Sequence, residues 1–404
     1  HLRYLLAIYE VSQTHLDISS RSIAEKLGVT KPSVVRIMNL LMERGMIVKE
    51  HYGKIYMTDR GIFVAKEVQA QLERVLQNFP PVNIELTEEE RFAAALALTG
   101  CAARRGGEDT GKLQVVCTLF PYYDFVRAIG GDRVEPYLLV TAGREAHSFE
   151  PTPLDVIRIS QADVFICNGG ESETWVDDIL DAAGESIGSV VHMMDHAHVL
   201  GEEFSEGMQG GHDHDEHAHD EHDGHEEAIE YDEHIWTSPR IAMDLCRVIA
   251  DTLAQADPAH AQEYQDRLAA YLRELTDLDR AFRDTVEAGQ RHLLVFGDRF
   301  PLLYFCREYG LDYRAAFHGC SGDTEPSLAT LKYLIDKVRA EQIPVVYTIE
   351  LSSQKVASAI AETTGARVLT FHSCQTLTRQ EFDGGETYLS LMWKNVDVLK
   401  EGLA

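Results

Sequence analysis

Short apolar runs alternate with amphipathic helical segments through residues 113–404. Short apolar runs suit parallel strands that are buried on both faces, whereas amphipathic helices repeat their apolar residues every three or four positions. Eight strands are predicted, at residues 113–119, 134–140, 163–168, 189–193, 292–296, 313–317, 345–349 and 367–371. Helices are predicted between them, including residues 122–129, 174–182, 239–255, 330–341 and 354–364.

A long charged amphipathic segment separates the first four predicted strands from the last four. We predict one helix from Pro258 to about Ala288, roughly 45 Å long at 1.5 Å per residue. Alternating strands and helices indicate an α/β fold with parallel sheets. The expected architecture is therefore two βα lobes, residues 113–256 and 291–404, joined by a long rigid helix within residues 257–290.

Residues 1–80 show a different pattern, with helices first. Apolar residues have helical spacing in residues 2–11 and 20–27. The turn Gly28-Val29-Thr30, in which glycine accepts positive φ, then leads into a third helix from Lys31 to Arg44. Two helices joined by a short turn that contains glycine form a helix-turn-helix.

An alternating stretch follows the third helix. Residues 46–50 and 54–57 alternate around His51-Tyr52-Gly53, which indicates a two-stranded wing. A winged helix-turn-helix places its recognition helix in a DNA groove. The expected DNA contacts are Lys31, Ser33, Arg36 and Asn39. A winged helix used for protein contacts is the alternative.

Residues 1–80, which we call the head, contain the stretch S-I-A-E-K-L-G-V-T-K-P-S-V-V-R-I-M-N-L-L-M-E-R-G-M-I, followed by Y-G-K-I-Y-M-T-D-R-G. It resembles the DNA-binding domain of the diphtheria-toxin-repressor family, closest to the manganese-responsive branch, over about residues 2–76. The family carries metal ligands in the first helix and after the wing. The corresponding places here hold Arg3, Leu6 and Leu72, which cannot bind a cation. The resemblance implies DNA binding but does not support metal sensing by the head.

Residues 81–112 form a predicted linker that contains Leu98-Thr99-Gly100-Cys101, similar to the cleavage box of bacterial lipoproteins. Lipidation of Cys101 would place the lobes outside the cytoplasm on a membrane anchor, whereas an intact chain would be cytoplasmic. Because a winged helix belongs in the cytosol, the junction suggests a fusion or two joined reading frames. The alternative is a remnant of the repressor's next helix at residues 93–101.

The head and the remainder of the chain differ in net charge. The net charge is −29, yet residues 1–80 hold 11 basic and 8 acidic residues, leaving 26 basic and 58 acidic residues in the remainder. The strongly acidic remainder of the chain should repel nucleic acid and lipid head groups and attract cations.

An acidic, histidine-rich stretch interrupts the first lobe and is predicted as a surface loop over residues 207–228. Its composition cannot bury enough apolar surface to fold. Neutral imidazole is a favoured zinc ligand, so we expect a low-affinity metal antenna. Its histidines are His212, His214, His217, His219, His222 and His225. A solvated acidic linker is the alternative.

Nitrogen and oxygen ligands follow several predicted strands. Ligands of α/β lobes collect at the carboxyl ends of strands, so we looked for metal-binding side chains there and before helices. The candidates are His147, His234, Asp298, Glu350 and His372. Imidazoles combined with carboxylates suit zinc, with manganese as the alternative when oxygen dominates.

Residues 113–404, which we call the body, also contain R-E-A-H-S-F-E-P-T-P-L-D, D-E-H-I-W-T-S-P, G-D-R-F-P-L-L-Y-F, D-T-E-P-S and Y-L-S-L-M-W-K-N-V-D-V-L-K. These motifs resemble those of the solute-binding proteins of zinc and manganese ABC importers, which are periplasmic binding proteins of the metal-binding type. The resemblance implies capture of zinc, or of manganese, and delivery to an ABC permease. It assigns His147 and His234 as the first two ligands. Asp298 stands near the family's third ligand, usually a histidine, while Glu350 and His372 are candidates for the fourth.

Two other classes of function are the alternatives. A metal-responsive transcriptional regulator would use the lobes as a sensor for the head. A zinc hydrolase would need an open coordination position and a general base. The sequence contains no H-E-x-x-H, G-x-S-x-G or phosphate-loop motif, so an enzyme is not expected.

Overall fold

The computed structural model describes residues 2–13, parts of residues 18–66, and residues 111–404 except 147–148, 184–186, 209–229 and 320–325. The chain divides into two compact units, residues 1–107 and residues 108–404. None of the helices in these described ranges combines the length and apolar character needed to cross a bilayer.

The first unit contains helix α1 (Leu2–Gln13) and strands β1 (Ile47–Lys49) and β2 (Ile55–Met57). The two strands pair antiparallel at the place predicted for the wing, with Ile47 opposite Met57. Its small core includes Ile8, Ile23, Val34 and Leu41. The four predicted DNA contacts lie outside the described residues, so the winged-helix assignment stays a prediction.

The N-terminal lobe of the second unit is built on a parallel sheet in the order β4-β3-β5-β6. Its strands are β3 (Leu113–Cys117), β4 (Val134–Leu138), β5 (Val164–Cys167) and β6 (Ser189–His192). Its helices are α6 (Phe120–Gly130), α7 (Pro153–Ser160) and α8 (Trp175–Ala183). Each predicted strand of this lobe is confirmed to within two residues at its ends.

The C-terminal lobe repeats this plan with a parallel sheet in the order β10-β9-β7-β8. Its strands are β7 (Leu293–Phe300), β8 (Asp312–His318), β9 (Val345–Thr348) and β10 (Arg367–Thr370). Its helices are α11 (Leu303–Tyr309), α12 (Leu328–Ala340), α13 (Lys355–Thr364) and α14 (Arg379–Asp383). All four predicted strands are again confirmed.

Strand β7 is longer than predicted. We expected it to end at Phe296, with Asp298 in the following loop. The strand instead continues to Phe300, and its register against β8 shifts between Phe296 and Arg299. Asp298 therefore lies within a bulge of the strand, and its predicted place in a loop is wrong. A bulge adds a residue and redirects side chains without ending the strand.

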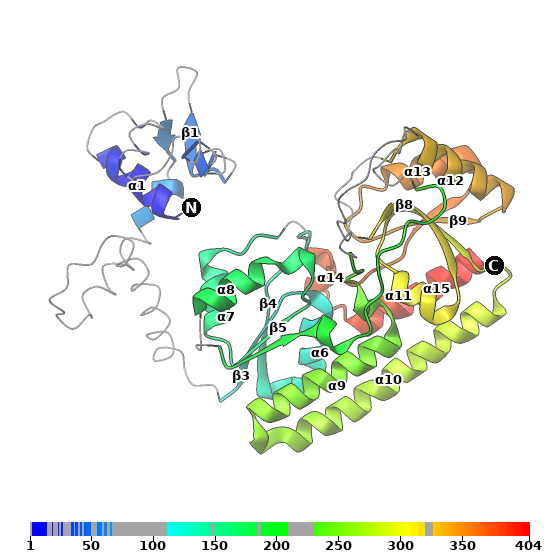
Figure 1. Cartoon of the computed structure of the whole chain (residues 1–404), viewed down its shortest axis with the longest axis horizontal. Coiled ribbons are helices and arrows are strands. Elements are labelled where there is room, and N and C mark those ends of the chain that lie inside the picture. The colour runs from blue at the N-terminus through cyan, green and yellow to red at the C-terminus, as the bar shows by residue number, and fades with distance from the viewer. Residues whose placement is uncertain are drawn as a thin grey trace, which may run out of the picture. The chain divides into compact units, whose positions relative to one another are not determined.

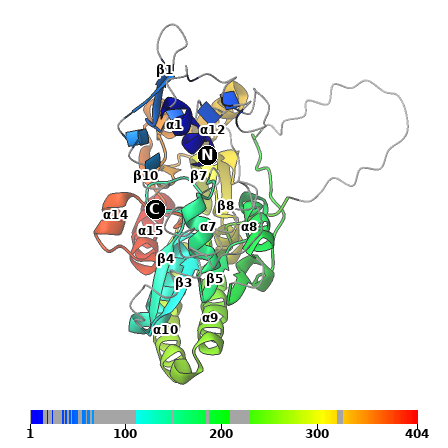
Figure 2. The same ribbon diagram turned by 90° about the vertical axis from the view of Figure 1, so that its left-hand side faces the viewer.

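Helix α10 (Ala261–Ala288) runs beneath both lobes (Figure 1). The predicted start at Pro258 is corrected, because residues Pro258–His260 form a separate short 3-10 turn. Helix α10 lies beside α9 (Pro239–Ala256) in both views (Figures 1 and 2). It also packs against α6 of the first lobe and α15 (Tyr388–Leu403) of the second.

The two lobes share one core. Phe125 of α6 contacts the ring of Tyr388 on α15 with centroids 4.9 Å apart. The Asp124 carboxylate accepts the backbone N–H of Tyr388 at 2.8 Å. One cluster of buried apolar residues extends through both sheets and the helices beneath them. Large hinge motion would break this core, so the fold favours small movements around a site between the lobes.

Glu173, after β5, is a buried carboxylate whose Oε2 accepts the N–H groups of Asn168 and Gly169 at 2.8 and 3.0 Å. Burial raises its pKa to about 7. The folded state therefore binds this proton more tightly than the unfolded state, and stability is lost as pH rises through about 7. Glu173→Gln should be more stable than the parent above pH 8, by on the order of 1–3 kcal/mol.

The difference should fade as pH falls toward 5, because the parent is then protonated too. Urea unfolding at pH 5 and pH 8 measures it, with the exposed Glu171→Gln as the matched control. An equal difference at both pH values would contradict the assignment.

Candidate metal centre

His234 is the most deeply buried of the predicted ligands that the structure describes, with 1% of its surface exposed. It directly precedes the short 3-10 turn Ile235–Thr237, and helix α9 follows with Ser238 as its cap. Its Nδ1 lies 3.1 Å from Asp232 Oδ1, and its backbone N–H donates to the same oxygen at 2.8 Å. A carboxylate only accepts, so in the neutral ring Nδ1 carries the proton and Nε2 keeps the lone pair that a metal needs.

The charges around His234 favour its protonated form. Burial opposes a charge on the ring, but the charge and hydrogen bond of Asp232 outweigh it. The charges of Glu233 and Glu202 add to this, and together they hold the pKa of His234 above its ordinary value. A metal must displace this proton, so metal affinity should fall as pH decreases through the raised pKa.

The segment that carries His234 is fixed by residues from both lobes. The Tyr304 hydroxyl of α11 donates to the Asp232 carbonyl oxygen at 2.6 Å. Glu233 accepts the backbone N–H of Ser172 at 3.0 Å, and the Asn168 amide donates to the Glu233 carbonyl oxygen at 3.0 Å. The position of His234 is therefore set by the N-terminal lobe on one side and by α11 on the other.

Gly319 shows how closely the C-terminal lobe approaches. It directly follows β8, and a Cβ atom built on it would lie 3.3 Å from His234 Cε1 and 3.3 Å from Asp232 Oδ2. Such contacts are tight, so any larger residue would press on the ring and on its carboxylate partner. His234 thus lies at the junction of the two lobes.

Asp298 occupies the β7 bulge near a second link between the lobes. Its Oδ2 accepts the N–H of Ile349 at 3.3 Å, which ties β7 to the end of β9. The next residue, Arg299, forms a two-pronged ion pair with Glu145 at 3.1 and 3.2 Å. Glu145 lies two residues before His147, which is outside the described residues. The ion pair brings the loop of the predicted first ligand toward the strand of the third.

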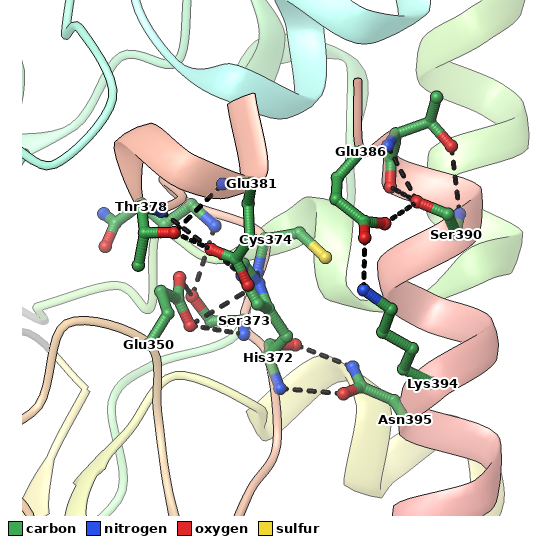
Figure 3. A network of polar contacts seen from close by, with 12 residues as sticks. Glu350, His372, Ser373, Cys374, Thr378, Glu381, Glu386, Ser390, Lys394 and Asn395 are labelled. Atoms are coloured by element: carbon green, nitrogen blue, oxygen red, sulfur yellow. Dashed lines mark hydrogen bonds and ion pairs between the residues drawn. The ribbon is translucent and has the colours of Figure 1, made fainter. Parts of the chain in front are cut away.

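Glu350 and His372 follow the neighbouring strands β9 and β10 and are engaged with each other (Figure 3). Glu350 accepts the Ser373 N–H at 2.8 Å and lies 3.7 Å from His372 Nδ1. That nitrogen also accepts the Cys374 N–H at 2.9 Å. His372 Nε2 faces Glu381 of α14 at 3.9 Å.

This network is electrostatically balanced. The nearby His372 ring, whose Nε2 lies 3.9 Å from the carboxylate, lowers the pKa of Glu381 to about 2, and the hydrogen bonds from Thr378 add to this. Burial disfavours charge on His372, but the charges of Glu350 and Glu381 raise its pKa. Asn395 of α15 holds the backbone of His372 from both sides, at 2.8 and 2.7 Å (Figure 3). The arrangement supports the ends of β9 and β10 whether or not either side chain binds metal.

The predicted ligands therefore have different contact partners in the structure. His234 has an orienting carboxylate, Asp298 lies beside an ion pair that links the lobes, and Glu350 and His372 contact each other. Among the residues that the structure describes, no three His, Cys, Asp or Glu side chains are arranged to hold a metal ion. His147, the six loop histidines and Cys101 lie outside those residues, so the full ligand set stays a prediction.

Sequence reasoning missed the residues that support His234. Asp232 belongs to the quoted D-E-H motif, and its spacing of two from the histidine was the available signal. Tyr304 and Gly319 are distant in sequence from the residues that they position, and Glu145 and Arg299, although each is close to a predicted ligand, are 154 residues apart. No local pattern marks them.

Comparison with known proteins places this geometry in a family. Residues 115–402 match the family described as ZnuA, zinc-uptake complex component A, periplasmic. The zinc-binding lipoprotein AdcA of Streptococcus pneumoniae is 32% identical over 310 residues, which are 76% of this chain. The chain spans 58% of that protein's length. The high-affinity zinc uptake system protein ZnuA of Bacillus subtilis is 31% identical, and the match covers 76% of this chain and 93% of that one.

Solved structures show the same fold. The Zn(II)-bound ZnuA-like domain of S. pneumoniae AdcA is similar with a TM-score of 0.59 and 28% identity, covering 72% of this chain and 99% of that domain. The metal-dependent lipoprotein YcdH of B. subtilis is similar with a TM-score of 0.60 and 29% identity, covering 72% and 100%. The predicted fold of the body, two lobes with parallel sheets, is confirmed.

Proposed function

Because the chain belongs to the ZnuA family of periplasmic zinc-uptake components, a family of metal-binding transport proteins and not of enzymes, we propose that it captures zinc and delivers it to an ABC import permease. One observation carries the proposal: a buried histidine, His234, has its Nδ1 fixed by Asp232 where the two lobes meet. A carboxylate behind an imidazole orients the ring and strengthens it as a metal ligand. The Zn(II)-bound relative with the same fold supports zinc over manganese.

We assign His147, His234 and Asp298 as the first three zinc ligands. His234 is oriented, Asp298 is held in the β7 bulge, and the Glu145–Arg299 pair draws the His147 loop toward that bulge. Glu350 and His372 stay candidates for the fourth position, with their mutual contact as the competing role. A binding protein needs a saturated shell, since an open position would admit water as in a catalytic site.

The proposed location of the lobes is outside the cytoplasm, anchored through lipid on Cys101. The periplasmic description of the family and the lipoprotein names of two relatives support this location. Cys101 itself lies outside the described residues.

For the head, residues 1–80, we propose a winged helix that binds DNA through Lys31, Ser33, Arg36 and Asn39. The antiparallel β1–β2 pair supports it, as do the helical residues 34–35, 37–38 and 41–42 that precede this pair. Regulation of transcription by zinc would require that the lobes alter this binding. A mobility-shift assay of the whole chain, with and without zinc, tests both points.

A zinc titration tests the proposed function. It compares the whole chain with a variant in which the six loop histidines are replaced by asparagine, which keeps the length of the insertion. Both proteins should hold one tight zinc per chain in competition with a chelator. The variant should capture zinc more slowly at low zinc in stopped-flow measurements, because the antenna is lost. No tight zinc in either protein would overturn the function, whereas equal capture rates would overturn only the antenna.

A further inference from the structure

The histidine-rich insertion begins and ends at one point beside the metal centre. Gly201 and Tyr231 form an antiparallel bridge. The N–H of Glu202 donates to the Glu230 carbonyl oxygen at 2.8 Å, and the N–H of Asp232 donates to the Leu200 carbonyl oxygen at 2.9 Å. The returning limb thus reaches Asp232 and His234 directly after this pairing. The base of the insertion therefore lies at the proposed metal site.

The outgoing limb, Glu202–Met208, lies on the C-terminal lobe, and we call it the strap. Glu202 pairs with His318 at the end of β8, and the Phe204 ring lies 5.3 Å from the His318 ring. Two ion pairs continue the contact: Glu203 with Arg307 of α11, and Glu206 with Arg314 of β8 at 2.9 Å. A segment of the N-terminal lobe therefore crosses to the other lobe through four successive side-chain contacts.

Gly207 brings the strap backbone against α12. Its φ is +91°, and a Cβ atom built on it would lie 2.0 Å from Cδ1 of Tyr333. The Tyr333 hydroxyl accepts from Arg314 Nε at 3.1 Å, so the ring is held in place from its far end. Only glycine fits here, both because of its positive φ and because the ring fills the space.

The strap is fixed by these contacts and not by close packing along its length. A cavity of about 190 Å³ lies between Glu203–Ser205 of the strap and residues of α11 and β8, among them Arg307 and Arg314. Both residues of the Glu203–Arg307 ion pair line this cavity, and so does Arg314, the partner of Glu206. Loss of one such contact should therefore release the strap without damage to the core.

We propose that the strap is a positioning element that ties the base of the insertion to the C-terminal lobe and thereby slows release of zinc from His234. Tyr304 connects the two: its hydroxyl accepts the Leu200 N–H at 3.0 Å and donates to the Asp232 carbonyl oxygen. Tyr304 belongs to α11, the helix that also carries Arg307. Release of the strap frees Asp232, and with it the ring of His234. This inference rests on the proposed zinc-binding function.

Gly207→Ala tests the strap, because the added methyl group cannot enter the space of the Tyr333 ring. Gly365→Ala is the matched control: Gly365 has a φ of +83° in the C-terminal lobe on which the strap lies, but a Cβ atom there meets nothing within 4 Å. Both changes place alanine at a positive φ, and only one displaces the strap. We expect zinc to leave Gly207→Ala about 3- to 10-fold faster, the effect of losing one or two partly exposed ion pairs. The control should release zinc at the parent rate.

A readout that needs no metal accompanies the zinc measurement. Hydrogen exchange at the amides of Glu202 and Asp232, which pair the two limbs, should be faster in zinc-free Gly207→Ala and unchanged in the control. The double variant Glu203→Gln/Glu206→Gln keeps the side-chain volumes and removes the charges, so it should shift both readouts in the same direction.

Three outcomes are distinguishable. Faster zinc release and faster exchange in both strap variants support the proposal. Tight zinc binding by the parent, with neither readout altered in the strap variants, overturns the strap and leaves the function standing. If the parent holds no zinc, the proposed function fails, and the strap's control of zinc release fails with it, even where exchange still reports a structural tie.

Discussion

His234→Ala should weaken zinc binding by more than about 100-fold, because removing a ligand should cost more than the 10- to 100-fold typical of losing its hydrogen-bond partner. The ring is buried and is oriented by Asp232 from a distance of 3.1 Å. Competition with a chelator of known affinity measures the change, and circular dichroism checks that the fold is retained. Asp232→Asn should fall between this variant and the parent, since the ring stays but loses its charged partner.

His260→Ala is the matched control for this result. His260 also has its Nδ1 beside a carboxylate, 2.6 Å from Asp257, but it lies in the turn before α10. Its replacement should leave zinc affinity unchanged. Parent-like affinity in His234→Ala would show that zinc binds elsewhere.

Trp236→Ala should lower the free energy of unfolding by about 3–5 kcal/mol, the range for large aromatic residues removed from a core. Trp236 is fully buried, and its indole N–H donates to the Ser373 carbonyl oxygen of the other lobe at 2.9 Å. Its own carbonyl oxygen accepts the Tyr388 hydroxyl at 2.7 Å. Trp236 therefore joins the His234 segment to the C-terminal lobe through its side chain and through its backbone. Urea denaturation of the zinc-free protein gives the value.

Trp393→Ala on α15 is the control, because that indole is 42% exposed and its removal should change stability by less than about 1 kcal/mol. Trp236→Phe separates the two contributions, since it keeps most of the ring and removes the hydrogen bond. Equal stability of Trp236→Ala and the parent would mean that the lobes are not coupled through this side chain.

The strands could be predicted because each is a short apolar run bounded by polar or turn residues. The exception, β7, is instructive. Gly297, Asp298 and Arg299 break its apolar run, and nothing local distinguishes a strand that ends from one that continues through a bulge. The physical reason for continuation is the pairing of Arg299 and Phe300 with β8, a contact that only the fold supplies.

The site was predictable only in part. His234 stood out because its motif precedes a helix and carries the resemblance to metal-binding proteins. The contact between Glu350 and His372 was not foreseeable, because it depends on β9 and β10 being neighbours in the sheet. Tyr304 is 72 residues from the Asp232 carbonyl that it binds. Such partners are chosen by strand order and helix packing, which hydrophobic periodicity does not encode.

The hydrogen bond from the backbone N–H of Tyr388 to the Asp124 carboxylate joins residues 264 positions apart. Contacts of such sequence separation form late and slow folding. The N-terminal lobe cannot complete its packing until residues 388–403 have been synthesised, although its four strands are available much earlier. The nascent body must therefore persist as an open, unfinished chain, a state in which its buried parallel strands are exposed to chaperones, proteases and each other.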